Sequence, residues 1–194
     1  MTALNGTLLL VRHASATGQA PNALLTPEGQ RQADALADAL AGEGVQRIVS
    51  SPWTRAMQSA QPLAERLGLS VETDARLTER VLSSADLPDW RERLQRSFEE
   101  PDARLPGGES SRAAQARGLA AVRDALTHGA DVTVIVTHGN LLTLLLQAFD
   151  RRVSFHTWAR LRNPDVFRLR VQAGRALPER LLLAPLPAPR DERF

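Results

Sequence analysis

Two of the four histidines of the chain come directly after apolar, strand-like runs. Residues 8–11 lead into Arg12 and His13, and residues 132–137 lead into His138. In open α/β sheets, ligands bind beyond the carboxyl ends of the strands. A histidine nitrogen placed there can attack phosphorus, and an arginine guanidinium matches the oxygens of a phosphoryl group. The spacing therefore predicts a site for a phosphoryl-bearing anion at one edge of a sheet.

Further side chains complete this candidate chemistry. Arg55 lies in the first turn of a helix expected after residues 46–50, so two arginines and a helix N-terminus can bind one phosphoryl group. His138 can hydrogen-bond to the transferring oxygens. The leaving oxygen then needs a proton, and Glu79 in the stretch LTER is the carboxyl that we assign as general acid. Together these residues predict phosphoryl transfer through a phosphohistidine at His13.

The elements that must position these residues alternate between strands and helices. Strands are expected at 8–12, 46–50, 69–73, 132–137, 165–171 and 181–184, and helices at 27–40, 51–67, 89–98, 110–128 and 141–149. Thr26 is a natural N-cap for the first helix, and Gly68 is a natural stop for the second. This alternation is typical of an α/β fold with a mostly parallel sheet between two layers of helices.

One domain is expected over residues 1–184, because 194 residues suffice for a single full core. Within it, residues 74–109 are interpreted as an insertion, or lid, over the site, and residues 185–194 as a frayed tail. An exposed edge strand near 165–171 could pair with a second copy. The sequence therefore leaves the oligomeric state open, with a homodimer among the alternatives.

Composition argues against several function classes. The chain has no cysteine and only four scattered histidines, so neither a metal site nor a cofactor is expected. No apolar run reaches the length of about 18 residues typical of a transmembrane helix, and no signal peptide is recognised, so a cytoplasmic location is expected. The net charge is only +2, which does not indicate nucleic-acid binding. The expected partner is a small phosphorylated metabolite, with neither nucleic acid nor membrane.

Six segments, in order, resemble the histidine phosphatase superfamily, which includes cofactor-dependent phosphoglycerate mutase. They are LVRHA at 10–14, Asn22 with LTPEGQRQA at 25–33, SSPWTRAMQSA at 50–60, LTER at 77–80, PGGES at 106–110 and VTHGN at 136–140. The resemblance implies a three-layer α/β/α sandwich of the phosphoglycerate mutase-like type that needs no metal. It also implies a role for each matching residue: His13 as nucleophile, Glu79 as proton donor, and Arg12, Arg55 and His138 as phosphoryl ligands, with a contribution from the amide of Asn22.

Several interpretations remain open at this point. Metal-independent hydrolysis of a small phosphomonoester is favoured, because only 26 residues (81–106) separate Arg80 from Gly107, whereas mutases have extra segments around the site. The alternatives are a cofactor-dependent phosphoglycerate mutase, a protein phosphohistidine phosphatase, and an inactive relative that only binds a phosphate ligand. The PGGES segment is interpreted as a turn and a helix cap that border the pocket.

Two further expectations concern the surroundings of the site. The charges of Arg12 and Arg55 should disfavour the protonated form of His13, which predicts a neutral nucleophile and an acid-to-neutral optimum. Residues 81–105 should form the leaving-group side of the pocket, and the tryptophans at 53, 90 and 158 either pack or line its entrance. His156 is expected in a polar loop, away from the site.

Overall fold

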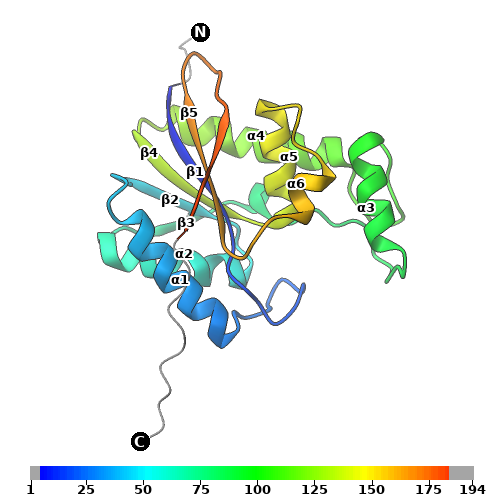
Figure 1. The fold of residues 1–194 in the computed structure, drawn as a ribbon, viewed down its shortest axis with the longest axis horizontal. Helices are drawn as coiled ribbons and strands as arrows, with labels where there is room; N and C mark the ends of the chain where they lie inside the picture. Colours follow the sequence, from blue (N-terminus) through cyan, green and yellow to red (C-terminus); the bar gives the residue numbers. More distant parts are fainter. Residues whose placement is uncertain (1–4, 184–194) are drawn as a thin grey trace, which may run out of the picture.

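The computed structural model describes residues 5–183 (Figure 1), and its centre is a six-stranded sheet in the order β3-β2-β4-β1-β5-β6. The strands are β1 (Gly6–Arg12), β2 (Arg47–Ser50), β3 (Val71–Thr73), β4 (Val132–Thr137), β5 (Asp165–Val171) and β6 (Pro178–Leu181). The first four run parallel, and β5 is antiparallel to both β1 and β6. The predicted mostly parallel sheet is thus confirmed.

Helices cover both faces of this sheet. They are α1 (Pro27–Leu40), α2 (Thr54–Leu67), α3 (Trp90–Glu99), α4 (Ser111–Thr127), α5 (Gly139–Phe149) and α6 (Phe155–Ala159), with a short 3₁₀ turn, η1, at Ala75–Leu77. Residues of α1 and α2 share one apolar cluster with Leu9 and Val11, while residues of α4 and α5 share another with Leu8 and Leu10. Successive side chains of a strand point to opposite faces, so β1 contributes to both cores. The result is a three-layer α/β/α sandwich.

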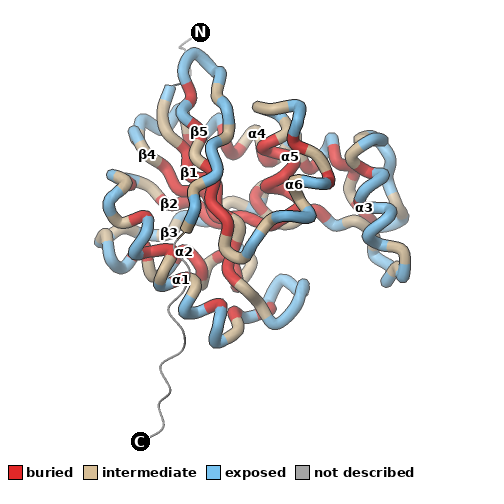
Figure 2. Tube along the Cα trace, in the orientation of Figure 1, coloured by how far each residue is buried: buried red, intermediate tan, exposed pale blue. Residues whose placement is uncertain are grey.

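Local chemistry explains where the helices on one face begin and end. Thr26 caps α1, because its hydroxyl oxygen accepts a hydrogen bond from the backbone N–H of Gly29 at 2.9 Å, and Pro27 takes the first helical position. Gly68 ends α2 in the left-handed region with φ 66°. On the other face, α5 is buried over its first eight residues, which agrees with its nearly unbroken apolar sequence. Figure 2 shows this buried centre of the molecule.

The strand at 165–171 occurs with the predicted bounds, but the prediction that it lies at the edge of the sheet is wrong. β5 lies between β1 and β6, so its hydrogen-bonding groups are paired on both sides. The last strand was expected at 181–184 and is instead found at Pro178–Leu181, as the second arm of a hairpin whose turn includes Gly174. Residues 1–4 and 184–194 lie outside the described residues, and so does the predicted tail at 185–194. The single-domain division at 1–184 stays a prediction.

His156 lies in a helix, α6, rather than in the expected polar loop. The helix has only five residues, too few to show a hydrophobic period. It is held by a capping box in which Ser154 and Thr157 bond to each other's backbone N–H groups.

Among residues 5–183, no helix combines the length and the apolar character of a membrane span, and no cluster of side chains suited to a metal ion occurs.

Candidate active site

The carboxyl ends of β1 and β4 bring the two predicted histidines together. These strands are parallel neighbours, with Arg12 paired to Thr137 in the register. The backbone N–H of His13 donates to the carbonyl of Thr137 at 3.0 Å, and the ring centroids of His13 and His138 are 5.1 Å apart. The two strand ends therefore meet at one site, as the sequence predicts.

The imidazole of His13 is held in a defined tautomer. Its Nδ1 lies 2.6 Å from the carbonyl oxygen of Ala14. A carbonyl oxygen can only accept, so Nδ1 carries the proton and Nε2 keeps its lone pair. That lone pair accepts a hydrogen bond from Nε of Arg55 at 3.0 Å. The nitrogen available for attack on phosphorus is therefore Nε2.

The pKa of His13 is lowered to about 3. Burial is the largest cause, since the side chain is shielded from water, and the charges of Arg55 and Arg12 lower the pKa further. The lowered pKa agrees in direction with the expectation for His13, although desolvation contributes more than the two arginines that the sequence pointed to. His13 is neutral throughout the ordinary pH range.

A fully buried guanidinium group, that of Arg55, and a half-buried one, that of Arg12, flank His13. Arg55 is fully buried, its Nη1 donates to the carbonyls of Gln19 and Ala20, and its Nη2 has no hydrogen-bond partner within residues 5–183. Arg12 donates through Nη1 to the carbonyl of Leu161 at 3.1 Å, while its Nε is likewise buried and without a partner there. Burial lowers the pKa of both arginines. Because donors left unpaired in the interior are costly, these groups indicate an anion-binding site.

His138 is fully buried behind His13 at the N-cap position of α5. Its Nε2 lies 2.8 Å from the hydroxyl oxygen of Ser51, and its Nδ1 is buried without a partner among the described residues. Burial first, and then the neighbouring positive groups, lower the pKa of His138 well below its usual value. Its imidazole is thus a neutral hydrogen-bonding group next to His13.

Glu79 reaches the same site from the segment between η1 and α3. One carboxylate oxygen, Oε2, accepts from the backbone N–H of Asn140 at 3.0 Å. The other, Oε1, accepts from the N–H groups of Leu141 and Arg80, both at 2.9 Å. The carboxylate therefore caps the N-terminus of α5, where the helix dipole favours negative charge. Oε2 keeps one lone pair that can hold a proton.

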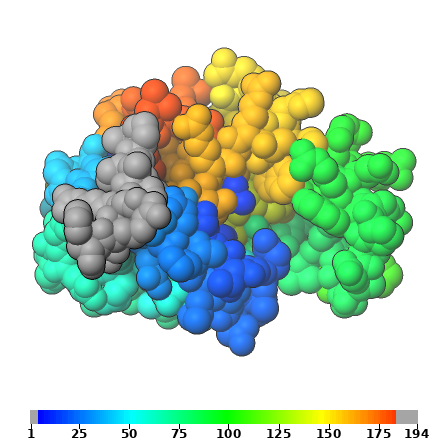
Figure 3. All heavy atoms as spheres, turned by 60° about the horizontal axis from the view of Figure 1, so that its bottom comes forward, coloured from blue at the N-terminus to red at the C-terminus, as the bar shows by residue number. Residues whose placement is uncertain are grey.

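These side chains adjoin a cavity of about 540 Å³. In Figure 3 the blue loop after β1, the yellow to orange segment around α6 and the green region around α3 surround a hollow. The floor of the cavity includes Arg12, His13 and Glu79, whereas the fully buried Arg55 and His138 lie behind that floor. Its outer wall is apolar and is formed by Leu82, Trp90, Leu94 and Trp158.

Asn22 is not among the residues that line this cavity, and its side chain is exposed. Its predicted contact with phosphate stays a prediction and is not part of the site proposed below. The tryptophans divide into two groups. Trp90 and Trp158 line the cavity in an edge-to-face pair with centroids 6.0 Å apart, whereas Trp53 packs against His138 and Arg55.

Several polar residues of the site were missed by the sequence reasoning. Ser59 accepts from the N–H of Ala14 at 2.9 Å, and the amide of Asn163 donates to the carbonyl of His13 at 2.7 Å. The side-chain amide of Asn140 is buried without a partner in the described part of the chain. Ser59 and Asn140 belong to motifs already quoted, so those motifs could have indicated them. Asn163 lies 150 residues from His13 and carries no comparable signal.

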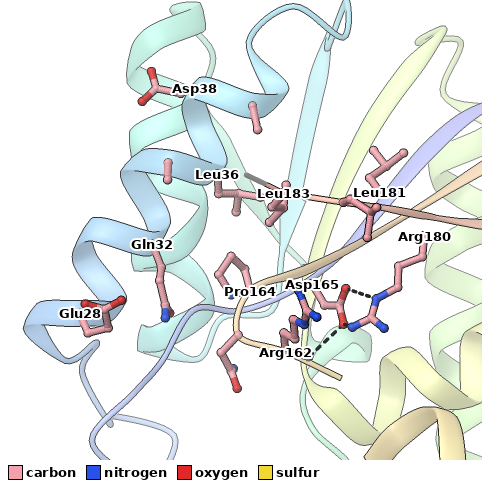
Figure 4. A pocket seen from close by; sticks show the side chains of 14 residues that line it. Glu28, Gln32, Leu36, Asp38, Arg162, Pro164, Asp165, Arg180, Leu181 and Leu183 are labelled. Atoms are coloured by element: carbon pink, nitrogen blue, oxygen red, sulfur yellow. Dashed lines mark hydrogen bonds and ion pairs between the residues drawn. The ribbon is translucent and has the colours of Figure 1, made fainter. Parts of the chain in front are cut away.

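A second cavity, of about 660 Å³, lies between α1 and the β5–β6 hairpin (Figure 4). Its central carboxylate, Asp165, accepts hydrogen bonds from Nε of Arg180 at 2.8 Å and from the backbone N–H of Arg162 at 3.0 Å. None of the predicted site residues lines it. Since its buried charge is already satisfied, this cavity offers no comparable chemistry.

The sheet order and the two helical layers define an α/β protein of the phosphoglycerate mutase-like class. A phosphoglycerate mutase from Bacillus anthracis has the same fold, with a TM-score of 0.72 at 16% identity over 92% of this chain and 93% of the other. Residues 8–181 match the sequence profile of the histidine phosphatase superfamily (branch 1). The chain therefore belongs to this superfamily, which confirms the resemblance of the six motifs.

Individual relatives carry both phosphatase and mutase names. A probable phosphoglycerate mutase, GpmB, of Yersinia enterocolitica is 31% identical over 157 residues, which cover 72% of each chain. The structure of a mycobacterial glucosyl-3-phosphoglycerate phosphatase has a TM-score of 0.73 at 25% identity, covering 93% of this chain and 99% of the other. An uncharacterised protein of Mycobacterium tuberculosis is 44% identical over 62 residues, so the match covers only 31% of that relative's length.

Proposed function

We propose that the protein hydrolyses small phosphomonoesters through a phosphohistidine formed on His13. The observation that carries this proposal is the state of the His13 ring. Its Nε2 keeps a lone pair, because Nδ1 is bound to the carbonyl of Ala14, and it lies beside buried donors of Arg55 and His138. A neutral, oriented imidazole next to the unpaired guanidinium nitrogens of Arg55 and Arg12 suits in-line attack on a phosphoryl group.

The proposed reaction has two steps, phosphorylation of His13 and hydrolysis of the phosphohistidine. In the first, Nε2 of His13 attacks phosphorus, the bond from phosphorus to the leaving oxygen breaks, and Glu79 transfers its proton to that oxygen. Arg55 and Arg12 bind the charge that develops on the phosphoryl oxygens, while His138 hydrogen-bonds to them. In the second, water attacks the phosphohistidine, Glu79 takes up a proton from the water, and the bond between Nε2 and phosphorus breaks to release phosphate.

The outer wall of the cavity favours hydrolysis over phosphate transfer between hydroxyls. A mutase must also hold a second phosphate group, which needs further cationic donors. Among residues 5–183, the one arginine besides Arg12 that lines this cavity is Arg80, and its guanidinium already donates to the carbonyl of Glu109 and the hydroxyl of Ser97. The remaining wall includes the indoles of Trp90 and Trp158, which suit an uncharged leaving group with an apolar face.

The proposal is tested by turnover of p-nitrophenyl phosphate and 3-phosphoglycerate in buffer containing EDTA. Released phosphate and 2-phosphoglycerate are both measured, and the His13→Ala variant serves as control. Release of phosphate without isomerisation supports a metal-independent phosphatase. Isomerisation that depends on the bisphosphate identifies a mutase instead. Absence of both reactions in the wild-type protein rejects catalysis of these reactions and favours a protein that only binds phosphate ligands.

A further inference from the structure

The PGGES segment at 106–110 contributes no side chain to the cavity, although it is one of the six motifs of the chain. Its glutamate faces α4 instead. The carboxylate of Glu109 accepts two parallel hydrogen bonds from Arg117, from Nε and Nη2, each at 2.8 Å. The two side chains are only 26% and 22% exposed. This bidentate pair is better shielded from water than an ordinary surface ion pair.

The pair is connected to the backbone that leads into Glu79. Nη1 of Arg117 donates to the carbonyl of Arg76 at 2.6 Å and to that of Thr78 at 2.9 Å. The carbonyl between them, of Leu77, accepts from the hydroxyl of Thr137 at 2.7 Å. Three consecutive carbonyls before Glu79 are therefore fixed, two by Arg117 and one by the last residue of β4.

The backbone after Glu79 is fixed by the same segment. The N–H of Glu109 donates to the carbonyl of Val81 at 2.8 Å, and Nε of Arg80 donates to the carbonyl of Glu109 at 2.9 Å. Gly108 allows this close approach, since a Cβ at that position would lie 2.1 Å from the carbonyl oxygen of Leu82. The backbone before Glu79 is thus held by Arg117, which Glu109 binds, and by Thr137, and the backbone after it is held by the PGGES segment itself.

We propose that Glu109 and Arg117 are positioning residues for the proton donor Glu79. This inference rests on the proposed function, because it assumes that Glu79 protonates the leaving oxygen. The pair does not touch the substrate. It holds the backbone on each side of Glu79, so that the carboxylate both caps α5 and faces the cavity. Proton transfer requires hydrogen-bond contact with the leaving oxygen, so a small displacement of this segment reduces its rate.

The test compares leaving groups rather than total activity. In Glu109→Gln we expect kcat/KM to fall about tenfold with phenyl phosphate, whose poor leaving group needs the proton, and less than about twofold with p-nitrophenyl phosphate. In a Glu79→Gln background, the same substitution should add less than about twofold with phenyl phosphate, because both changes affect one proton transfer. Arg117→Met is a second variant that removes the other partner.

A matched control lies on the same helix. Arg112 of α4 pairs with Asp102, but both side chains are more than half exposed, at 62% and 71%. Asp102→Asn should leave both substrates unaffected. Thermal unfolding of each variant identifies any loss of folded protein. Equal losses with both substrates, or no loss in either variant at Glu109 and Arg117, overturn the positioning role. A wild-type protein without turnover refutes the proposed function itself.

Discussion

At the level of single residues, the two histidines of the site differ in the hydrogen-bond partners of their ring nitrogens. The Nε2 lone pair of His13 accepts a hydrogen bond from Arg55, whereas His138 hydrogen-bonds to Ser51 and lies behind the cavity floor. Burial keeps both rings neutral by lowering their pKa values. In the mechanism proposed above, one imidazole attacks phosphorus and the other hydrogen-bonds to the oxygens around it.

This division of roles predicts different outcomes for His13→Ala and Glu79→Gln. Loss of His13 should abolish turnover of every phosphomonoester, because no other described side chain holds its position as nucleophile. Loss of Glu79 should reduce kcat/KM by about a hundredfold for phenyl phosphate but leave p-nitrophenyl phosphate within several-fold, since only the poor leaving group needs the proton. Steady-state kinetics with both substrates provide the measurement. Full turnover by His13→Ala would falsify the mechanism.

Asn22→Ala, assayed in the same series, tests the remaining predicted ligand. Asn22 is exposed outside the cavity, so its replacement should change kcat/KM by less than about twofold, the range expected for a residue without substrate contact. A loss of tenfold or more, with unchanged thermal unfolding, would show that the amide reaches the substrate during the reaction.

At the level of elements, the two tryptophans of the cavity wall lie on different helices. The sequence predicted one of these helices and missed the other. The helix that carries Trp90 was expected at 89–98, from its flanking polar stretches, and occurs at Trp90–Glu99. The helix that carries Trp158 was missed, because five residues are too few to show a period. Its capping box, Ser154 with Thr157, was the one local signal available.

This wall predicts a preference for ring-bearing leaving groups. Trp90→Ala should lower kcat/KM for 1-naphthyl phosphate by about tenfold, the effect of losing roughly 1.4 kcal/mol of aromatic contact, and should change that for glycerol phosphate little. Leu177→Ala is a matched control, because Leu177 is also an exposed apolar side chain, 69% accessible, but does not line the cavity. Equal effects on the two substrates would indicate that the wall does not contact the leaving group.

At the level of the whole molecule, the sequence predicted the parts of the fold that repeat a regular pattern. The strand at 165–171 has the predicted bounds, but its place inside the sheet depends on its pairing with β1 and β6, which no local pattern encodes. Likewise the sequence allowed His13 and His138 to be predicted at one edge of the sheet, because each follows an apolar run. Asn163 contacts the carbonyl of His13 only because the antiparallel β5 begins next to the carboxyl end of β1.

The buried neutral state of His13 also predicts how the stability of the whole protein depends on pH. The folded pKa of His13, about 3, lies below the unfolded value near 6.5, so between these values the unfolded chain binds a proton that the folded chain does not. The contribution of His13 to the free energy of unfolding should therefore be fully present above about pH 6.5 and be lost as the pH falls towards 3, and its size is on the order of 5 kcal/mol.

Urea unfolding across this pH range, compared between the wild-type protein and His13→Gln, measures this contribution. The variant should lose less stability on acidification, because the buried ionisable ring is gone. His156→Gln is the matched control, since it replaces an exposed histidine of α6 that lies outside the site. Parallel curves for the wild-type protein and His13→Gln would contradict the lowered pKa of His13.

The central position of β1 affects the order in which the strands can pair while the chain is being synthesised. Synthesis proceeds from the N-terminus, so β1 leaves the ribosome long before its two neighbours in the sheet, β4 and β5. A nascent chain that ends after α5 already contains both histidines, yet it lacks β5 and Asn163 beside the backbone of His13. The β5 side of β1 can therefore be paired only after residues 165–171 have been made, and only then can the amide of Asn163 reach the carbonyl of His13.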